Sequence, residues 1–460
     1  MADTMTSLAP RRFGIGNRLR GLVALAMIDT NIVVASVILA NLLRAVSSVV
    51  LTRLLLPEAF GIAGIIASIS FTAGMMADLG FQPFVVRHAD GDRPHFLDTV
   101  WTVAILRSLA ITVALIALSQ PIANLLGKPD LQLLIAVASL GFLIDGIASP
   151  TLITALRHRM ILRLTTLELG VAVFQLAVSV ALAFLWRDYW AILMAMLAAG
   201  VLKTCLSYIA FPDSSRRLAL DRGYVRELWK FARFVAGSSL ITIFSMQTDK
   251  WILAALMPLD EFGFYILAVN LASAPIAFAA AYPSRVLYPY CAQVYRERAQ
   301  DLRRLFYAKR QLPSLIYCFA AGGLVGTAPV VIAILYQPAY AGAATYLQLL
   351  AIAPMFALST ASANEALVAS GRVQATFYTS VARLLWLVTA LPVGYLIGRE
   401  LGLVAAVGLM EPAILLFKWA QLRAARLLDL GAEATFLLAG GAGVFTGSVI
   451  DYILRHAHLV

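Results

Sequence analysis

The feature that most constrains this chain is a series of long apolar stretches that recurs along almost its whole length. About twelve stretches of membrane-spanning length are separated by charged or proline- and glycine-rich breaks. Hydrophobic residues make up 61% of the sequence and charged residues only 13%, which is more apolar side chain than one water-soluble core can bury. A strand barrel would show short alternating segments instead. The sequence therefore predicts an all-α polytopic membrane protein.

The predicted spans have the length of about 20 residues that a membrane helix needs. They cover residues 32–56, 60–85, 97–120, 131–155, 165–186, 188–211, 231–257, 261–290, 310–336, 343–369, 374–398 and 402–422. A further apolar run, residues 434–454, is interrupted by glycines and Asp451. It could span the membrane, lie at its surface or pack against the protein.

Loop charge orients these spans, because lysine and arginine concentrate on the cytoplasmic side. One set of alternate loops carries Arg87, Arg93, Arg157, Arg159, Arg163, Arg216, Arg217, Arg222, Arg226, Lys230, Arg296, Arg298, Arg303, Arg304, Lys309, Arg310, Arg372, Lys418, Arg423 and Arg426. The other set holds little more than Arg53, Lys128, Arg187 and Arg399. We expect the N-terminus in the cytoplasm and a return there after the twelfth span. The net charge of +11 then reflects topology, not nucleic-acid binding.

The chain repeats one phrase at nearly half its length. LLLPEAFG at 54–61 and LMPLDEFG at 256–263 place their Phe-Gly pairs 202 residues apart in a chain of 460. A weaker echo joins PIANLL at 121–126 to PVVIAIL at 329–335. Six spans per copy give both copies the same orientation, which predicts a parallel repeat of two six-helix lobes.

The repeat suggests a division of the chain into five parts. We expect a cytoplasmic tail at 1–24, an N-lobe with helices 1 to 6 at 25–212, a cytoplasmic linker at 213–230, a C-lobe with helices 7 to 12 at 231–428 and a C-terminal segment at 429–460.

The first copy of the repeat resembles a known family. Residues 51–87, LTRLLLPEAFGIAGIIASISFTAGMMADLGFQPFVVR, resemble the opening of polysaccharide transporters in the multidrug/oligosaccharidyl-lipid/polysaccharide exporter superfamily. In that family a first helix ends in L-x-P-x-x-F-G and a second in D-L-G-F followed by arginine. MQTDKWILAALMPLDEFG at 246–263 and YPSRVLYPYCAQVYRERAQDLRRLFYAKR at 282–310 are similar to its seventh and eighth helices and the loop that follows. The resemblance covers about residues 25–425.

The resemblance implies a V-shaped pair of lobes that rock between inward- and outward-open states. It also implies a flippase that moves an oligosaccharide on a polyprenyl diphosphate across the bacterial inner membrane, for exopolysaccharide, O-antigen or capsule synthesis. Membrane lipids, a polysaccharide polymerase and export machinery would be its partners.

Such a substrate requires cations at membrane depth, where an ionisable side chain usually faces a cavity or a partner. Arg44 in the first span and Lys250 in the seventh are the strongest candidates for a cavity that binds the diphosphate. Lys203, Arg383 and Arg107 also lie within spans. Buried structural pairing or snorkelling is the alternative for all five residues, and for these three it is at least an equal alternative.

Four acidic residues in the spans are candidates for counter-ions or for coupling to Na+ or H+. They are Asp249, Asp145, Glu411 and Glu365. Asp249 and Lys250 are neighbours, but adjacent residues on a helix do not face each other. We expect their partners on other helices, with Arg44 or Lys203 as a counter-ion for Asp249.

The basic segment 294–312 is periodically apolar through Val294, Leu302, Leu305 and Phe306. It could lie as a helix on anionic headgroups or serve as an ordinary anchor on the cytoplasmic side.

Two alternative functions remain. A cation-coupled multidrug antiporter of the same superfamily would need an acidic or aromatic cavity, which Arg44 and Lys250 disfavour. A membrane-embedded glycosyltransferase or polymerase would need a sizeable outer loop, whereas the predicted outer loops are short. Soluble-type catalytic motifs, His clusters and metal or cofactor sites are not evident, so we expect a transporter and not an enzyme.

Overall fold

The computed structural model describes residues 39–77, 80–158, 160–211 and 216–457. Over these ranges the secondary structure is helical, without strands, which confirms the predicted all-α class. The expected tail at 1–24 and Arg159 lie outside the described residues. By length and apolar composition, eight described stretches could cross a membrane, or nine if a bent helix pair counts as one crossing. The chain is therefore a multi-pass membrane protein, and twelve crossings stay a prediction.

The first half of the chain forms a helix at Leu39–Thr52 and seven further helices. These are α2 (Pro57–Met76), α3 (Phe81–Arg87), α4 (Pro94–Leu125), α5 (Leu131–Ile147), α6 (Thr151–Arg157), α7 (Ile161–Trp186) and α8 (Trp190–Ile209). The bent pair is α5 and α6, which meet at an angle of 55°. Proline at the first position of α2 and α4 suits a helix start, because the N–H that proline lacks would be unpaired there.

The second half has helices that are interrupted more often than those of the first half. It consists of α9 (Arg222–Leu256), α10 (Leu259–Ala272), α11 (Ile276–Tyr282), the π-turn η1 (Pro283–Leu287), α12 (Tyr288–Arg298), the 3-10 turn η2 (Ala299–Asp301), α13 (Leu302–Leu335), the 3-10 turn η3 (Pro338–Tyr340), α14 (Ala343–Leu350), α15 (Ile352–Ala369), α16 (Gln374–Gly408), α17 (Met410–Ala424) and α18 (Leu430–His456). Within α16 the backbone leaves helical geometry at Gly398 and Arg399, and Gly394 and Gly402 then pack against each other. The chain therefore turns back there, where the sequence predicted a loop.

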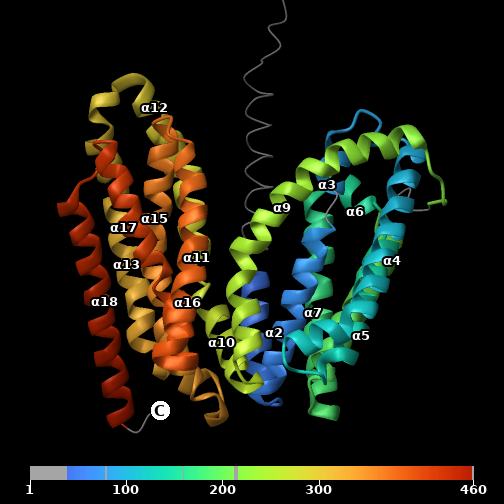
Figure 1. Ribbon diagram of the computed structural model, residues 1–460, viewed down its shortest axis with the longest axis horizontal. Helices are drawn as coiled ribbons and strands as arrows, with labels where there is room; N and C mark the ends of the chain where they lie inside the picture. The colour runs from blue at the N-terminus through green and yellow to red at the C-terminus, as the bar shows by residue number, and fades with distance from the viewer. Residues whose placement is uncertain (1–38, 78–79, 159, 212–215, 458–460) are drawn as a thin grey trace, which may run out of the picture.

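The helices form two groups that meet at one end of the molecule and diverge toward the other, which gives a V shape (Figure 1). One group contains α2 to α8 and the other α11 to α18, with α9 and α10 between them. We call the meeting end the corner end, because both copies of the repeated phrase turn there. The opposite end carries α3, α6 and α12 with the arginine-rich loops, and we call it the basic end.

The two copies of the repeated phrase are in direct contact at the corner end, where α2 packs against α10. A β carbon on Gly61 would overlap the carbonyl oxygen of Leu259, and one on Gly263 would overlap that of Pro57. These contacts are reciprocal, as a two-fold axis between duplicated halves requires. The packing supports the predicted duplication.

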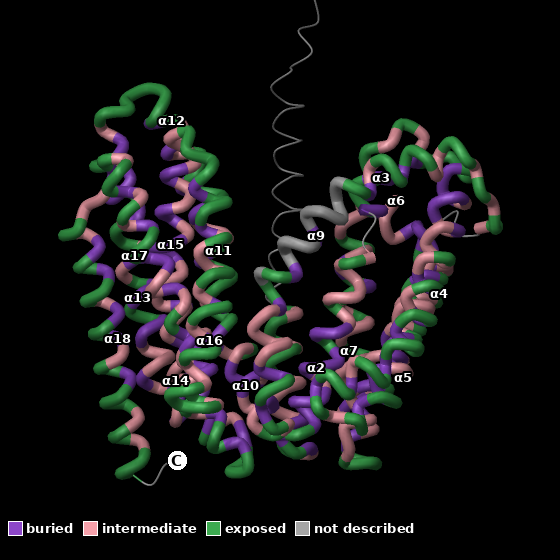
Figure 2. Tube along the Cα trace, in the orientation of Figure 1, coloured by how far each residue is buried: buried purple, intermediate pink, exposed green. Residues whose placement is uncertain are grey.

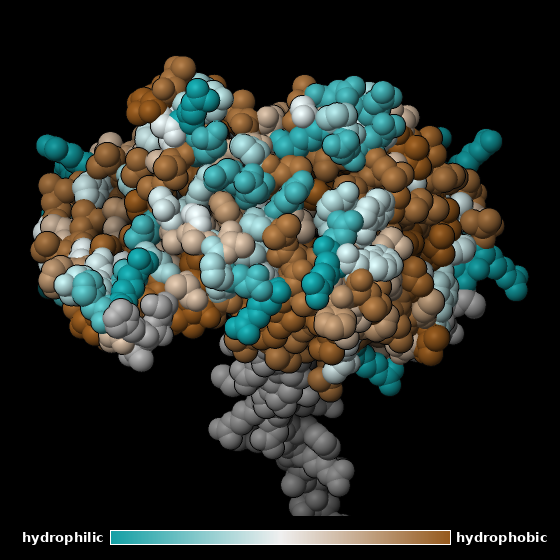
Figure 3. Space-filling view, turned by 90° about the horizontal axis from the view of Figure 1, so that it is seen from below, coloured by the Kyte–Doolittle hydropathy of each residue, from teal (hydrophilic) through white to brown (hydrophobic). Residues whose placement is uncertain are grey.

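Burial follows the same arrangement. The largest core cluster joins α2, α5, α10, α14 and parts of α9 and α16, and buried residues are dense where α2, α10 and α14 meet (Figure 2). Seen from the corner end, hydrophilic residues gather over the middle of the face, whereas its flanks are mainly hydrophobic (Figure 3). This distribution suits an end that meets water and sides that meet lipid.

α9 begins inside the segment that the sequence assigned to a linker. Asp221 caps it by accepting hydrogen bonds from the backbone N–H groups of Gly223 and Tyr224. Its first turns pack on the first half, where Glu227 lies 2.9 Å from His88. α9 therefore starts on the first half and ends between the two groups of helices.

The apolar run 434–454 forms part of α18, which is long and apolar enough to cross a membrane. α18 starts near the basic end, where Asp429 lies 3.5 Å from Arg303, and ends at the corner end (Figure 1). It packs along α13 through close backbone contacts such as that of Gly322 with Gly440, which small residues allow.

The basic segment 294–312 forms the end of α12, η2 and the start of α13. Val294, Leu302 and Phe306 are buried in a cluster with residues of α15 and α18. Its apolar side therefore packs inside the protein, and the interpretation as a helix lying on headgroups is wrong.

Candidate functional site

Arg44 lies on the helix Leu39–Thr52 with its side chain exposed. Its Nη1 atom donates to Oδ1 of Asn41 at 3.4 Å. One turn further on, the Ser48 hydroxyl lies 3.5 Å from that of Tyr336 in the second half. Residues four apart share a helix face, so Arg44 lies on the face that is directed at the second half. The alternative of buried pairing does not describe Arg44.

Asp249 has its partner on another helix, as the sequence predicted, whereas Lys250 does not. The Tyr265 hydroxyl of α10 donates to Oδ2 of Asp249 at 2.6 Å. Lys250 Nζ donates to the carbonyl of Met246 in its own helix at 2.8 Å. Lys250 thus needs no acidic partner to stay in place, and its side chain is half-buried.

The face of α9 that packs against α2 lies beside Lys250 and does not include it. Ser68 donates to Oε1 of Gln247 at 2.7 Å, and the Trp251 indole N–H donates to the Thr72 hydroxyl at 3.2 Å. These two α9 residues are four apart and mark one face. Lys250 is offset from that face by the turn of the helix, which leaves its ammonium outside the α2 contact.

The first-half cations make protein contacts. Lys203 Nζ lies 3.2 Å from Oδ1 of Asp145, so Asp145, and not Asp249, is its counter-ion. The Arg107 guanidinium lies 4.9 Å from the centre of the Phe81 ring and donates to a backbone carbonyl of residue 77 at 3.4 Å. Both cations therefore contact protein groups, but the Lys203–Asp145 pair is half exposed and is not the buried pairing that the sequence left as an alternative.

In the second half, predicted residues of both signs gather between α15, α16 and α17. Arg383 Nη2 lies 2.6 Å from Oε1 of Glu411. Lys418, which is fully buried, donates to Oδ1 of Asn364 at 2.9 Å and interacts electrostatically with Glu365 and Glu411. The cluster balances two basic with two acidic groups. Lys418 was counted with the cytoplasmic loop charges although it falls in the predicted span 402–422. That count was wrong, because its side chain is buried within the protein.

A second buried pair was missed. Arg310 lies 3.0 Å from Glu433 with side chains 0% and 1% exposed, and it joins α13 to α18. The Tyr307 hydroxyl donates to the same carboxylate at 2.9 Å, Arg310 donates to the Ser359 hydroxyl at 3.0 Å, and the Phe436 ring centre lies 4.7 Å from the guanidinium. Arg310 was counted as a loop residue, which is incorrect.

A helical pattern could have identified these buried cations. Arg310 follows Phe306 by four residues and precedes Tyr317 by seven, and both are buried on its face. Lys418 follows Leu415 by three residues and precedes Leu422 by four, and both leucines are buried. A basic residue that continues an apolar stripe is better assigned to the helix than to the loop beside it.

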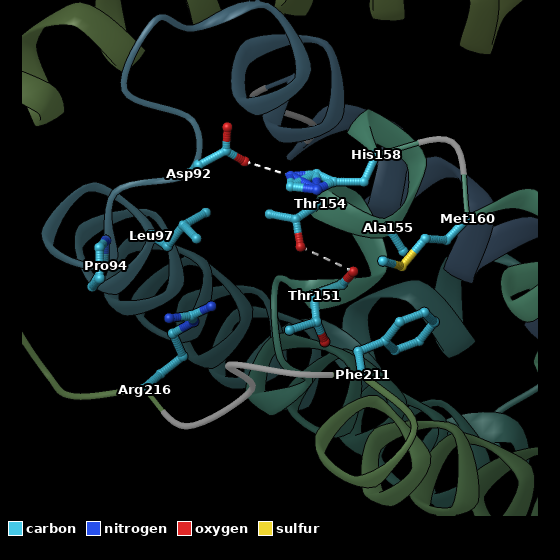
Figure 4. Close-up of a pocket in the computed structure, with 10 residues that line it drawn as sticks. All are labelled: Asp92, Pro94, Leu97, Thr151, Thr154, Ala155, His158, Met160, Phe211 and Arg216. Carbon is cyan, nitrogen blue, oxygen red and sulfur yellow. Dashed lines mark hydrogen bonds and ion pairs between the residues drawn. The ribbon is translucent and has the colours of Figure 1, made fainter.

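A separate cavity of about 310 Å³ opens at the basic end of the first half. Asp92 and His158 pair on one side of it, with Oδ1 and Nε2 2.7 Å apart, Thr154 donates to the carbonyl of Thr151 at 3.2 Å, and Arg216 lines the opposite side (Figure 4). Its lining residues are not among the nine predicted ones. Within the described ranges, His, Cys, Asp and Glu side chains do not group in threes as metal ligands would.

The nine predicted residues therefore occupy several places. Two acid–base pairs form, one in each half, and Glu365 joins the second-half cluster. Arg44 and Lys250 stand apart from these pairs, on helices that face or lie between the halves.

Comparison with known proteins finds one matching family and several relatives. Residues 50–345 match the family described as polysaccharide biosynthesis protein. The chain is 26% identical over 290 residues to the amylovoran biosynthesis protein AmsL of Erwinia amylovora, covering 62% of this chain and 73% of AmsL. It is 22% identical over 317 residues to the succinoglycan biosynthesis transport protein ExoT of Rhizobium meliloti (strain 1021), covering 67% of this chain and 62% of ExoT.

Among solved structures, the fold is similar to that of the lipid II flippase MurJ in an inward closed conformation. The TM-score is 0.69 over 91% of this chain and 92% of that one, at 12% sequence identity. At this identity the likeness concerns the fold.

Proposed function

The chain belongs to the polysaccharide biosynthesis protein family, and from that premise we propose that it is a flippase. Its substrate would be an oligosaccharide on a polyprenyl diphosphate, moved across the bacterial inner membrane for exopolysaccharide, O-antigen or capsule synthesis. One relative is named as a biosynthesis transport protein, and a protein of similar fold is named as a lipid II flippase. Both names support a transporter of lipid-linked glycans and not an enzyme.

The observation that carries the proposal is that the two groups of helices meet at the corner end and diverge toward the basic end (Figure 1). Gly61 and Gly263 close the corner end. Alternating access requires two such arrangements of the same halves. With the basic end in the cytoplasm, this arrangement is the inward-facing one and the N-terminus is cytoplasmic.

Arg44 and Lys250 are the proposed diphosphate ligands. Both make hydrogen bonds within their own helices and can exchange these for phosphate oxygens. Lys203, Arg107 and Arg383 already contact the protein and would act on substrate less directly. The polyprenyl tail would stay in lipid throughout.

Coupling to Na+ or H+ is part of the proposal, with Asp249 as the first candidate. Its carboxylate accepts a hydrogen bond from Tyr265 and lies on α9, which contacts both groups of helices. Asp145, Glu411 and Glu365 have basic residues nearby, which favours a counter-ion role for them. A polysaccharide polymerase and export machinery would act on the product.

Deletion of the gene, followed by analysis of lipid-linked intermediates, tests the function. A flippase defect leaves completed repeat units on the cytoplasmic leaflet, protected from an added outer probe. A polymerase defect instead leaves single units exported. Accumulation of exported single units in the deletion strain would refute the proposal, and cytoplasmic accumulation that the intact gene reverses would support it.

A further inference from the structure

Lys128 joins the first half of the chain to the second at the corner end. It lies in the loop between α4 and α5, and its Nζ atom donates to the carbonyls of Ala254 at 2.5 Å and Met257 at 3.0 Å. These carbonyls belong to the end of α9. Burial lowers the pKa of Lys128, which agrees with an ammonium partly withdrawn from water.

Local sequence positions this lysine. Gly127 adopts the left-handed conformation with φ +66°, which a residue with a β carbon rarely adopts. The N–H of Lys128 then donates to the carbonyl of Ala123 at 2.9 Å, so the chain closes α4 with a Schellman motif. The turn directs the Lys128 side chain away from α4 and toward α9.

A matching contact runs in the opposite direction. The Tyr340 hydroxyl donates to the carbonyl of Leu55 at 2.8 Å, and Gln337 Nε2 donates to that of Arg53 at 2.8 Å. The acceptors lie in the turn that follows the helix Leu39–Thr52 of the first half, and the donors lie in the loop between α13 and α14. Tyr340 is fully buried.

The two contacts are related by the duplication. Leu55 and Met257 are separated by 257 − 55 = 202 residues, the same offset as the two Phe-Gly pairs. In each direction, the loop after the third helix of one half caps the end of the first helix of the other half. The donors differ, with an ammonium on one side and a phenol and an amide on the other. Of the acceptors, Leu55 and Met257 correspond, whereas Arg53 and Ala254 miss the common offset by one residue.

The last carbonyls of a helix lack partners within the helix, and an unpaired buried carbonyl costs more than a hydrogen bond gains. Each half therefore donates hydrogen bonds to carbonyl groups of the other half that lack a donor within their own helix. Separation of the halves at this end removes all four hydrogen bonds until water replaces them.

We propose that Lys128 and the pair Gln337 and Tyr340 are the reciprocal latches of the outer gate. They hold the corner end closed by capping the first helix of the opposite half, and they release when the halves open outward. The proposal rests on the proposed alternating-access function for its consequence in transport. It assigns a role to Lys128, a residue otherwise explained as an outer-loop charge.

Spin-label distances in lipid nanodiscs test the latches without substrate. The inter-half pair is Leu133→Cys with Ile397→Cys, both exposed, and the control pair within one half is Leu133→Cys with Leu185→Cys. Cys205 is the exposed natural cysteine and is replaced by serine. The natural buried cysteines, Cys291 and Cys318, remain.

Lys128→Met and Tyr340→Phe keep the side-chain bulk and remove the donors. At about 1 kcal/mol per lost hydrogen bond, Tyr340→Phe, which removes one bond, should raise the ratio of open to closed inter-half distances about fivefold. Lys128→Met removes two bonds and should raise that ratio about 30-fold. The double variant should approach the product of the two factors, because independent sites add. Arg187→Met, which removes an exposed cation from the α7–α8 turn, and the control pair should leave the ratio unchanged.

The outcomes separate the latch from the transport function. Inter-half distances that match the wild type in both single variants and in the double variant would overturn the latches, whatever the lipid-linked intermediates show. Shifted distances support the latches even if the deletion strain exports its repeat units normally, a result that would refute the transport function alone. Equal shifts in Arg187→Met would also overturn the specific assignment.

Discussion

Gly61 and Gly263 pack against each other's helices at the corner end, each beside the backbone carbonyl that starts the opposite helix. The offset between them is the offset of the repeated phrase. The phrase is therefore an interface with its own duplicate. Its glycines are required because a side chain at either position would meet backbone, which cannot move aside as a flexible side chain can.

Replacing Gly61 or Gly263 with alanine should loosen this interface. Each substitution is expected to lower the free energy of unfolding by about 1 to 3 kcal/mol, the usual cost of overpacking. The midpoint of thermal unfolding in detergent, followed by tryptophan fluorescence, measures the effect. Gly170→Ala is the matched control, because Gly170 lies within α7 with open space around it. An equal loss in the control would contradict the interface.

The Arg310–Glu433 pair should hold α18 on α13. Arg310→Met alone, or Glu433→Gln alone, leaves the charge of the remaining partner buried without its counter-ion. Each single substitution should therefore lower the free energy of unfolding by about 3 to 5 kcal/mol. The double variant Arg310→Met with Glu433→Leu should recover much of that loss, since both polar groups are then gone. Thermal unfolding and proteolysis of the α17–α18 connection report the change.

The control for this pair is Arg455→Ala at the other end of α18. Arg455 lies 3.1 Å from Asp451 but is half exposed, and such pairs contribute about 1 kcal/mol or less. A double variant that is as unstable as the sum of the single ones would count against the paired role of Arg310 and Glu433.

Arg44→Ala and Lys250→Ala should each reduce translocation about 10- to 100-fold, because a hydrogen bond to a charged group contributes about 1.5 to 3 kcal/mol. Glutamate at either position should reduce it further. The measurement is translocation in proteoliposomes, normalised to the amount of protein inserted. Arg187→Ala removes a cation from a turn at the corner end and should be neutral. Undiminished transport by both variants would remove Arg44 and Lys250 from the proposed site.

The cap of α9 predicts a specific dependence on pH. Backbone hydrogen bonds from Tyr224 and Gly223 hold the pKa of Asp221 below its usual value of 3.8. A carboxyl group whose pKa is lower in the folded state stabilises the folded protein. Its contribution is complete at pH values above the pKa of the unfolded state and is lost as the pH falls through the pKa of the folded state. Asp221→Asn keeps a capping side chain but cannot titrate there.

The difference in unfolding midpoint between wild type and Asp221→Asn should therefore shrink as pH falls from 5 to below 3.8. The difference between the two proteins cancels the pH dependence that the other carboxylates give to the unfolding midpoint, because both proteins contain them. The effect is small because Asp221 is exposed. A difference that stays constant across this range would show that Asp221 does not stabilise the start of α9 as a carboxylate.

Features that depend on neighbouring residues or on a regular period were predictable. Long apolar runs indicate helices, and loop charge separates the two ends of the molecule. The separate partners of Asp249 and Lys250 follow from helical geometry alone. The residues of two ion pairs were identified, but their pairing was not. Lys203 meets Asp145 and Arg383 meets Glu411 through contacts between helices, which the linear order does not specify.

The environment of a basic residue near the end of a span was harder to predict. Arg310 and Lys418 stand next to basic loops, and loop charge was read as if every basic residue there met water. The helices continue through both residues and bury them, because partners on other helices satisfy their charges. Glu433 was left unassigned for the same reason, since its partner lies 123 residues away.

By itself, then, the sequence determined an all-helical membrane chain with two duplicated halves, because hydrophobic length, charge asymmetry and repetition are properties of consecutive residues. Only the tertiary structure decided that the repeated phrases touch each other, that α18 runs to the corner end, and that Lys128 and Tyr340 cap the opposite halves. These contacts join backbone groups far apart in the chain, and a carbonyl carries no mark in the sequence of which side chain will satisfy it.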